Sequence, residues 1–330
     1  MSPPAIVVQN LSKRYGNSHG VLALDQVNLS IEGGTVFGLM GPNGAGKTTL
    51  IKVLTGISDI TSGSASVAGF DVRKESLKVR ARIGWVAAEV ILEDDFSAWE
   101  NLWLQAELQG GIPGWEERAQ YLLDYFGLAD RKLDKVSKFS TGMRKKLEIA
   151  LALLHQPSVI FMDEPTIGLD VATRRTLWDI VTGIHKEFGV TVLLTTHYIE
   201  EADALCDRIA IIDRGKIVAE GTPSELKARV KSDIVQLETS ESVDATLLSN
   251  IPGVQDVRAQ GNDWIIQVAA SEEFLPQLFA RVQTNEIRRI SVEKPSLETV
   301  FLQITGHRIG EEEPMHDIRK FYAQMRRARG

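Results

Sequence analysis

The sequence is nearly free of cysteine, because Cys206 is the single cysteine in 330 residues. An intramolecular disulfide is therefore impossible, and a reducing compartment is the simplest interpretation. We expect Cys206 to be a buried small hydrophobic side chain. Long apolar runs are also lacking, since no stretch approaches the roughly 18 uncharged residues that a membrane-spanning helix needs. The first four residues have neither the basic region nor the apolar core of a signal peptide. These absences predict a cytoplasmic protein that associates with a membrane only peripherally.

The sequence also has no excess of positive charge. Lysine and arginine together number 37 against 44 aspartates and glutamates, which gives a formal net charge of −7. A dedicated nucleic-acid-binding protein is normally basic, so we expect no nucleic-acid partner. The 43% hydrophobic and 25% charged content is that of a globular protein, and the length suggests about two domains.

Strand-like and helix-like segments alternate through the first 230 residues. A strand-rich region is followed by a glycine-rich loop and a helical stretch, then by a mainly helical region, and apolar strands return later. Strands that alternate with helices predict an α/β fold with a parallel sheet wrapped by helices. The segments are strands within 5–37, a helix at 47–54, helices within 93–156, and strands at 158–162, 190–195 and 208–212.

The pattern changes after about residue 230. Between Asp233 and Val292 the expected order is strand, helix, strand, strand, helix, strand, which predicts a smaller α+β domain of the ferredoxin-like type. A helix over 296–305 closes this domain. We therefore expect one domain at 1–230, a second at 231–306, and a charged tail at 307–330. The tail is either an amphipathic helix or a solvated segment.

The strongest motif is a phosphate-binding loop between an expected strand and an expected helix. The segment 41–49, G-P-N-G-A-G-K-T-T, fits the pattern G-x-x-x-x-G-K-[ST]. In this loop, backbone N–H groups and the helix N-terminus surround a phosphate group, Lys47 supplies positive charge, and Thr48 holds Mg²⁺. The predicted ATP-binding residues here are Gly41, Asn43, Gly44, Ala45, Gly46, Lys47, Thr48 and Thr49.

A second motif places two acids at the end of an apolar strand. Four apolar residues, 159–162, precede Asp163 and Glu164. A carboxylate at this point reaches the Mg²⁺ beside the loop, so Asp163 is a predicted metal ligand. Glu164 is then next to the attacking water and is predicted to be the general base.

A third group of motifs resembles the ABC ATPase family. The segment 139–144, F-S-T-G-M-R, is similar to the family signature. Ser140 could cap a helix there, while N–H groups near Gly142 face the γ-phosphate of ATP. The family's D-loop corresponds to 165–170, ending at Asp170, and its switch histidine, which senses the γ-phosphate, corresponds to His197. Tyr15 matches the aromatic residue that stacks on adenine.

This resemblance covers about residues 5–230 and implies a P-loop NTPase fold. The family has a RecA-like parallel core with an antiparallel β subdomain and a helical subdomain. It also implies a catalytic set of Lys47, Glu164 and His197 acting on ATP with Mg²⁺. Two such chains dimerise head to tail around two ATP molecules, and the intact motifs favour a homodimer. A separate permease would then hold the subunit at the inner face of the cell membrane.

One family motif departs from its usual form. The family's Q-loop has a glutamine where this sequence has Ala88, in the segment I-G-W-V-A-A. Glu89 follows directly, and we consider it a candidate metal ligand in place of that glutamine. The closing segment 295–302, P-S-L-E-T-V-F-L, is similar to that of the drug, sodium and lipid or polysaccharide export group.

Two other functions remain as alternatives. One is a non-transport ABC ATPase that acts on ribosomes or nucleic acid. The ribosomal type usually has two cassettes in one chain, and the DNA-repair type has a long coiled-coil insertion, whereas neither is present here. The other is a regulatory module without catalysis. It is disfavoured because Lys47, Asp163, Glu164 and His197 are all present. The leading hypothesis is an ATP-hydrolysing subunit of an ABC transporter, and export is the direction implied by the C-terminal resemblance.

Overall fold

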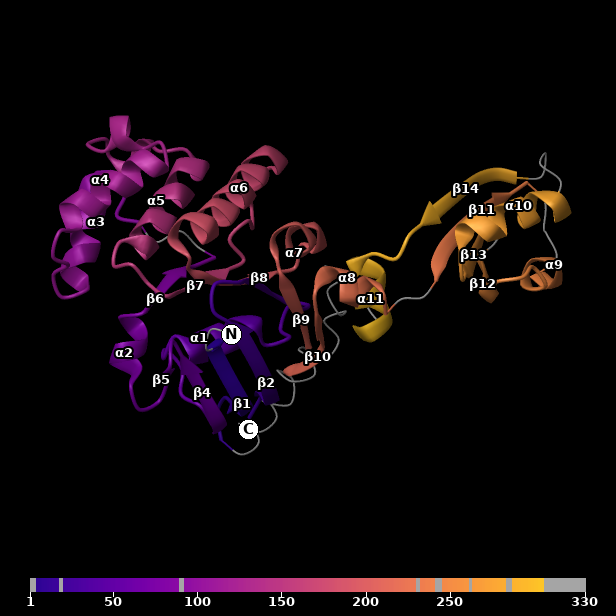
Figure 1. The fold of residues 1–330 in the computed structure, drawn as a ribbon, viewed down its shortest axis with the longest axis horizontal. Helices are drawn as coiled ribbons and strands as arrows, with labels where there is room; N and C mark the ends of the chain where they lie inside the picture. The colour runs from indigo at the N-terminus through magenta and orange to yellow at the C-terminus, as the bar shows by residue number, and fades with distance from the viewer. Residues whose placement is uncertain are drawn as a thin grey trace, which may run out of the picture. The chain divides into compact units, whose positions relative to one another are not determined.

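The computed structural model divides the chain into two compact units, one ending at Thr222 and one beginning at Pro223 (Figure 1). It describes residues 4–17, 20–88, 92–229, 232–240, 245–260, 263–282 and 287–305. Glu89 and the tail at 307–330 lie outside these described residues. No helix in the described ranges is both long enough and apolar enough to cross a membrane.

The first unit begins with an antiparallel sheet of four strands in the order β2-β1-β4-β5. Along β2, buried Val27, Leu29 and Ile31 alternate with exposed polar residues, so one face of the strand packs inward. The strands are β1 (Pro4–Arg14), β2 (Leu22–Glu32), β4 (Ser62–Val67) and β5 (Phe70–Asp71).

A second sheet forms the centre of this unit and has the strand order β10-β9-β3-β8-β7-β6. Every neighbouring pair is parallel except β9 and β10. Strands β3, β7 and β8 are buried along their whole length, and their sequences are accordingly rich in apolar residues. The strands are β3 (Val36–Met40), β6 (Ile83–Val86), β7 (Val159–Asp163), β8 (Thr191–Thr196), β9 (Arg208–Asp213) and β10 (Lys216–Gly221).

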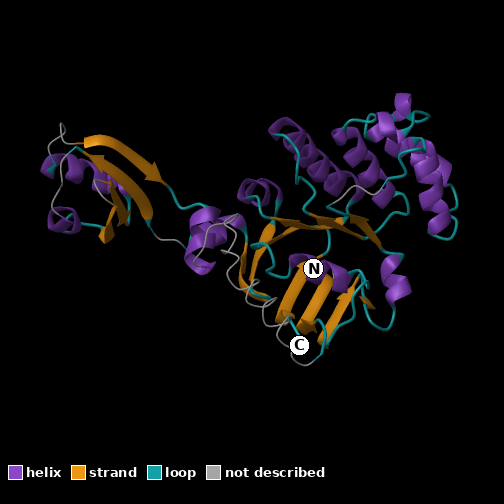
Figure 2. Ribbon diagram, turned by 180° about the vertical axis from the view of Figure 1, so that it is seen from behind, coloured by secondary structure: helices purple, strands orange, loops and turns teal. Residues whose placement is uncertain are grey.

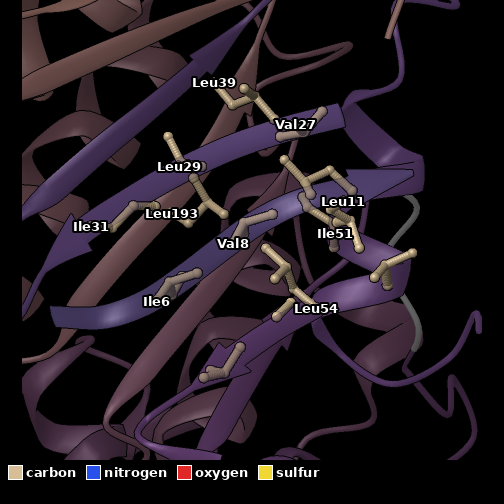
Figure 3. Close-up of a cluster of buried hydrophobic side chains, with 14 of the residues drawn as sticks. Ile6, Val8, Leu11, Val27, Leu29, Ile31, Leu39, Ile51, Leu54 and Leu193 are labelled. Atoms are coloured by element: carbon tan, nitrogen blue, oxygen red, sulfur yellow. The ribbon is translucent and has the colours of Figure 1, made fainter. Parts of the chain in front are cut away.

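Helix α1 (Lys47–Leu54) lies between the two sheets (Figures 1 and 3). Its buried residues include Leu50, Ile51 and Leu54, which pack against both sheets in one hydrophobic cluster. The short helix α2 (Ser76–Arg80) follows β5. Because α1 starts at the phosphate-binding loop, this packing fixes the loop against the central sheet.

The remaining α-helices of the first unit lie on the other side of the central sheet from α1 (Figure 2). Helices α5 and α7 contact the sheet, and α3 and α4 pack on α5. Helix α3 has the capping box that its sequence predicts: the Ser97 hydroxyl accepts from Glu100 N, and the Glu100 carboxylate accepts from Ser97 N. The helices are α3 (Ala98–Leu108), α4 (Trp115–Tyr125), α5 (Thr141–Leu153), α6 (Val171–Phe188) and α7 (Ile199–Leu205).

The second unit has its own core and a sheet in the order β12-β13-β11-β14, with all pairs antiparallel. This is the ferredoxin-like arrangement. Helix α11 (Leu297–Thr305) packs on α8 (Pro223–Lys227). The predicted fold class is thus confirmed. The other elements are β11 (Asp233–Thr239), α9 (Ala245–Ser249), β12 (Val254–Gln260), β13 (Asp263–Val268), α10 (Ser271–Arg281) and β14 (Ile287–Glu293).

Candidate functional site

The phosphate-binding loop joins β3 to α1 and depends on glycine at close contacts. Gly46 precedes the helix with a φ of 112°, where other residues are strained. A Cβ at Gly46 would lie 2.6 Å from the Ala23 carbonyl oxygen, and one at Gly41 would lie 2.3 Å from that of Ile212. No side chain caps α1. Its N-terminal N–H groups therefore provide a site for an anion.

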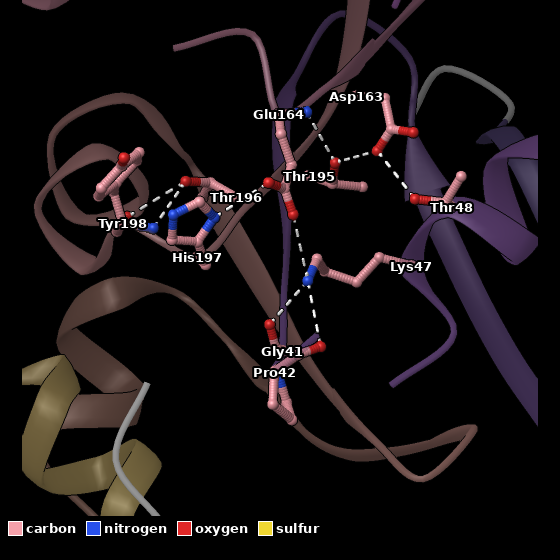
Figure 4. A network of polar contacts seen from close by, with 10 residues as sticks. All are labelled: Gly41, Pro42, Lys47, Thr48, Asp163, Glu164, Thr195, Thr196, His197 and Tyr198. Carbon is pink, nitrogen blue, oxygen red and sulfur yellow. Dashed lines mark hydrogen bonds and ion pairs between the residues drawn. The ribbon is translucent and has the colours of Figure 1, made fainter. Parts of the chain in front are cut away.

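Lys47, the first residue of α1, is buried and held by the loop itself. Its Nζ donates to the carbonyl oxygens of Gly41 at 2.8 Å and Pro42 at 3.2 Å. The same Nζ lies 3.4 Å from Glu164 Oε1 (Figure 4). These contacts place one positive charge between the phosphate-binding loop and the end of β7.

Asp163 ends β7 and is buried beside the loop. Its Oδ1 accepts from the Thr195 hydroxyl at 2.6 Å and lies 3.4 Å from the Thr48 hydroxyl (Figure 4). The carboxylate and the hydroxyl are both hard oxygen donors, which suit Mg²⁺ bound by few protein ligands and by phosphate groups. The donor set therefore fits the metal that the sequence predicts.

Glu164 has a strained backbone and two well-defined neighbours. Its φ of 47° is unusual for a residue with a side chain. The Glu164 N–H donates to the Thr195 hydroxyl at 3.0 Å, which fixes the backbone to β8. Its Oε2 lies 3.0 Å from His197 Nδ1 (Figure 4). Strands β7 and β8 thus bring this carboxylate, the histidine and Lys47 together.

These residues border a cleft of about 290 Å³. Of the predicted residues, the cleft is lined by Asn43, Gly44, Gly46, Lys47, Thr48, Thr49 and Glu164. It is also lined by residues that sequence reasoning missed, namely Val21, Leu22, Ala23, Arg214 and Gly215. The hairpin turn between β9 and β10 reaches the loop because Gly215 N donates to the Ala45 carbonyl at 2.9 Å. No local motif in the sequence marks this contact.

Tyr15 lies next to the loop, with its ring 42% exposed. Burial raises the pKa of its phenol. Hydrogen bonds with Thr49 and Ser58, and the charges of Lys13 and Lys52, outweigh that effect and lower the pKa below 10.0. The Lys13 ammonium is 4.8 Å from the ring centroid. Thr49 and Lys52, which act on the pKa of this phenol, both belong to α1.

The other predicted residues are not among the residues that line the cleft. Ser140 caps α5 by accepting from Met143 N at 3.3 Å, with Gly142 in the first turn. Asp170 caps α6 by accepting from the N–H and hydroxyl of Thr173, and these hydrogen bonds lower the pKa of its carboxyl. Within one chain these three residues therefore stand at helix starts away from the phosphate-binding loop.

The pattern of the ABC transporter family matches residues 24–167, and that of the "ATP-binding protein DrrA1-3-like, C-terminal domain" matches residues 221–305. The chain is 37% identical over 306 residues to the linearmycin resistance ATP-binding protein LnrL of Bacillus subtilis, which covers 90% of this chain and 97% of LnrL. It is 39% identical over 312 residues to the daunorubicin resistance ATP-binding protein DrrA3 of Streptomyces coeruleorubidus, covering 93% and 97%.

Among solved structures, the chain is similar to the ATP-binding cassette MJ0796. That structure is described as a dimer in a post-hydrolysis state with bound ADP and Pi. The TM-score is 0.59 at 28% identity, over 66% of this chain and 98% of that one. The match confirms the fold of the first unit and its nucleotide-binding class. The chain therefore belongs to the ATP-binding proteins of ABC transporters, the enzymes that hydrolyse ATP in those transporters.

Proposed function

We propose that this chain binds ATP with Mg²⁺ at the cleft of the first unit and hydrolyses it between two copies of itself to drive export through a separate permease. The observation that carries the proposal is the convergence of Lys47, Thr48, Asp163, Glu164 and His197 at one edge of the central sheet (Figure 4). These residues come from three segments of the chain, and each has the chemistry that one step of phosphoryl transfer needs.

In this proposal the phosphates lie over the loop and the N-terminus of α1. Backbone N–H groups and Lys47 offset their negative charge. Thr48 and Asp163 would hold Mg²⁺, which supplies further positive charge to the β- and γ-phosphates. Thr195 fixes both acids, since its hydroxyl donates to Asp163 and accepts from Glu164 N.

Glu164 takes the proton of the attacking water. The water oxygen bonds to the γ-phosphorus as the bond to ADP breaks, and the products are ADP and phosphate. His197 is 3.0 Å from the same carboxylate, so it orients Glu164 and contacts the γ-phosphate. The positive φ of Glu164 fits this role, because strained backbone is concentrated at functional sites.

A second copy of the chain would complete each site. Ser140 and Gly142, at the start of α5, and Asp170 do not line the chain's own cleft, and in this proposal they face the cleft of another copy. The dimeric MJ0796 structure supports this arrangement by similarity. Two complete sets of motif residues would then enclose two ATP molecules.

The permease would contact a groove of about 470 Å³ beside the position of the missing glutamine. The groove is lined in part by Trp85 of β6 and Ala87 directly after it, by Gln105 of α3 and by His155 after α5. Contact there would place the subunit on the inner face of the cell membrane. The export direction is supported by relatives that are named for resistance to linearmycin and daunorubicin.

The test of catalysis is Glu164→Gln, which removes the base and keeps the size of the side chain. We expect ATP to bind as in the wild type and turnover to fall by about 10²–10⁴-fold. Glu200→Gln, an exposed change of the same charge in α7, is the matched control and should turn over normally. Unchanged turnover in Glu164→Gln would remove Glu164 from the proposed role.

The test of the partner uses the same variant. Tagged Glu164→Gln protein is purified with ATP from gently solubilised native membranes, and the proteins that accompany it are identified. Recovery of a polytopic membrane protein is the expected result. Recovery of ribosomes or nucleic acid without a membrane protein would contradict the transport function and favour the non-transport alternative.

A further inference from the structure

Three side chains outside the phosphate-binding loop form a continuous stack that ends at the catalytic carboxylate. The Arg174 guanidinium carbon lies 3.9 Å from the centroid of the Tyr198 ring. The centroids of the Tyr198 and His197 rings are 4.1 Å apart, with the ring planes tilted by 40°. His197 Nδ1 in turn lies 3.0 Å from Glu164 Oε2. Each member therefore restricts the position of the next.

The middle of the stack is fixed by the backbone. Tyr198 N donates to the Thr196 hydroxyl at 2.9 Å, and Thr196 is 1% exposed at the end of β8 (Figure 4). Tyr198 is also the residue that precedes α7, and its carbonyl accepts from Ala202 N at 3.3 Å. The tyrosine ring is thus anchored on two elements and is a firm support for the histidine beside it.

The outer end of the stack comes from another element. Arg174 is in the first turns of α6, and its backbone N–H donates to the carbonyl of Asp170, the N-cap of that helix. The Arg174 Nε is buried and has no hydrogen-bond partner within the described ranges. Buried Glu201 lies nearby and accepts from the indole of Trp178 at 3.2 Å. A guanidinium in such surroundings is partly desolvated, which strengthens its attraction to the ring face.

We propose that Arg174 and Tyr198 are positioning residues that hold the imidazole of His197 against Glu164, and that they link this histidine to the start of α6. The inference rests on the catalytic role proposed for His197. A shift of α6, which begins directly after the D-loop, would then change the position of His197 without changing the phosphate-binding loop. Such a shift would change the rate of ATP turnover and leave the affinity for ATP unchanged.

The first test separates binding from turnover in single-turnover ATP hydrolysis. Arg174→Ala and Tyr198→Ala should each lower the rate by about 3- to 10-fold, the range that a cation–π or ring contact can account for. Their affinity for ATP should stay that of the wild type. Arg175→Ala, an exposed change of the same charge one residue away, is the control and should keep the wild-type rate. Tyr198→Phe retains the ring and should recover most of the rate lost in Tyr198→Ala.

The second test asks whether the loss acts through His197. In His197→Ala protein, adding Arg174→Ala should cause no further loss, because the ring that it positions is gone. A purely structural role of Arg174 would instead multiply the two losses and would overturn the inference. So would a normal rate in Arg174→Ala. If Arg174→Ala does not fold, Arg174→Met keeps the apolar stem and serves in the same cycle.

Different results would contradict the catalytic role of His197 and the positioning role of Arg174 and Tyr198. A normal rate in His197→Ala contradicts the catalytic role of His197 itself, and with it the stack. A slow His197→Ala together with a normal Arg174→Ala contradicts the stack alone and leaves the proposed function in place.

Discussion

At the residue scale, two glycines of the phosphate-binding loop differ in the space around them. Both have positive φ, 79° for Gly44 and 112° for Gly46. A Cβ at Gly44 would meet nothing within 4 Å, whereas one at Gly46 would lie 2.6 Å from a backbone oxygen. A side chain at Gly44 would thus strain only the backbone conformation. A side chain at Gly46 would strain the backbone and also collide with the Ala23 backbone.

We therefore expect Gly44→Ala to lower the free energy of unfolding by about 1 kcal/mol, the cost of a left-handed conformation with a side chain. Gly46→Ala should lower it by more than about 2 kcal/mol, because the Ala23 backbone must also move. Urea denaturation monitored by fluorescence measures both. Equal effects would show that the close contact at Gly46 does not determine the cost.

Glu201 gives a prediction for pH. Its pKa is raised above the ordinary 4.5, mainly because burial disfavours the carboxylate. Hydrogen bonds, one of them from Trp178, and the charge of Arg174 oppose this effect. The folded protein holds this proton to a higher pH than the unfolded chain does. The contribution of Glu201 to stability is therefore complete below pH 4.5 and is lost as the pH rises through the raised pKa.

Glu201→Gln cannot titrate, so its free energy of unfolding minus that of the wild type should increase as the pH rises from 4.5 towards neutrality. Chemical denaturation of both proteins in a series of buffers gives this difference. A difference that stays constant with pH would mean that Glu201 titrates alike in the folded and unfolded states.

The predicted residues that line the cleft come from motifs in which the chemistry and the local backbone are specified together. Gly44, Gly46, Lys47 and Glu164, which follows an apolar strand, are of this kind. The conformation of Glu164 and the approach of Arg214 had no such signal. The conformation of Glu164 depends on a hydrogen bond to Thr195. The position of Arg214 depends on the turn between β9 and β10, which donates a hydrogen bond to Ala45, a residue far away in the sequence. No short stretch of sequence predicts contacts between chain segments that are so far apart.

At the element scale, two of the described helices of the first unit begin with a serine cap, and they provide a matched pair. Ser97 caps α3 and Ser140 caps α5. Replacing either by alanine should lower the free energy of unfolding by about 1 kcal/mol. If Ser140 also faces ATP in a second chain, Ser140→Ala alone should lose ATPase activity. Thermal denaturation and steady-state hydrolysis measure the two effects. Equal activity in both variants would limit Ser140 to a structural cap.

The boundaries of several elements followed from local patterns. The helix predicted at 47–54 is α1 with the same limits, and the order of elements after Asp233 is as predicted. Loop chemistry and apolar periodicity encode these features over a few residues. The order β12-β13-β11-β14 and the insertion of β3 between β8 and β9 do not appear in such patterns. They depend on pairing between distant strands, which the structure defines.

At the scale of the whole molecule, each unit has a hydrophobic core of its own among the described residues, which in the first unit surrounds α1. The residues lining the cleft belong to the first unit, and they come from the start of β2, the phosphate-binding loop, the end of β7 and the turn after β9. Signature residues do not line it. In the proposed function, one chain would therefore supply two incomplete halves of an ATP site, and a dimer would join them.

The most direct test of this account is the assembly state of Glu164→Gln with saturating ATP and Mg²⁺, measured by sedimentation velocity together with the amount of bound nucleotide. The account predicts a monomer without nucleotide and a dimer with two ATP molecules when nucleotide is present. Exchange of ATP for ADP should return the dimer to monomer. A chain that stays monomeric while holding ATP, and whose wild-type turnover per chain does not depend on protein concentration, would contradict a catalytic site shared between two copies.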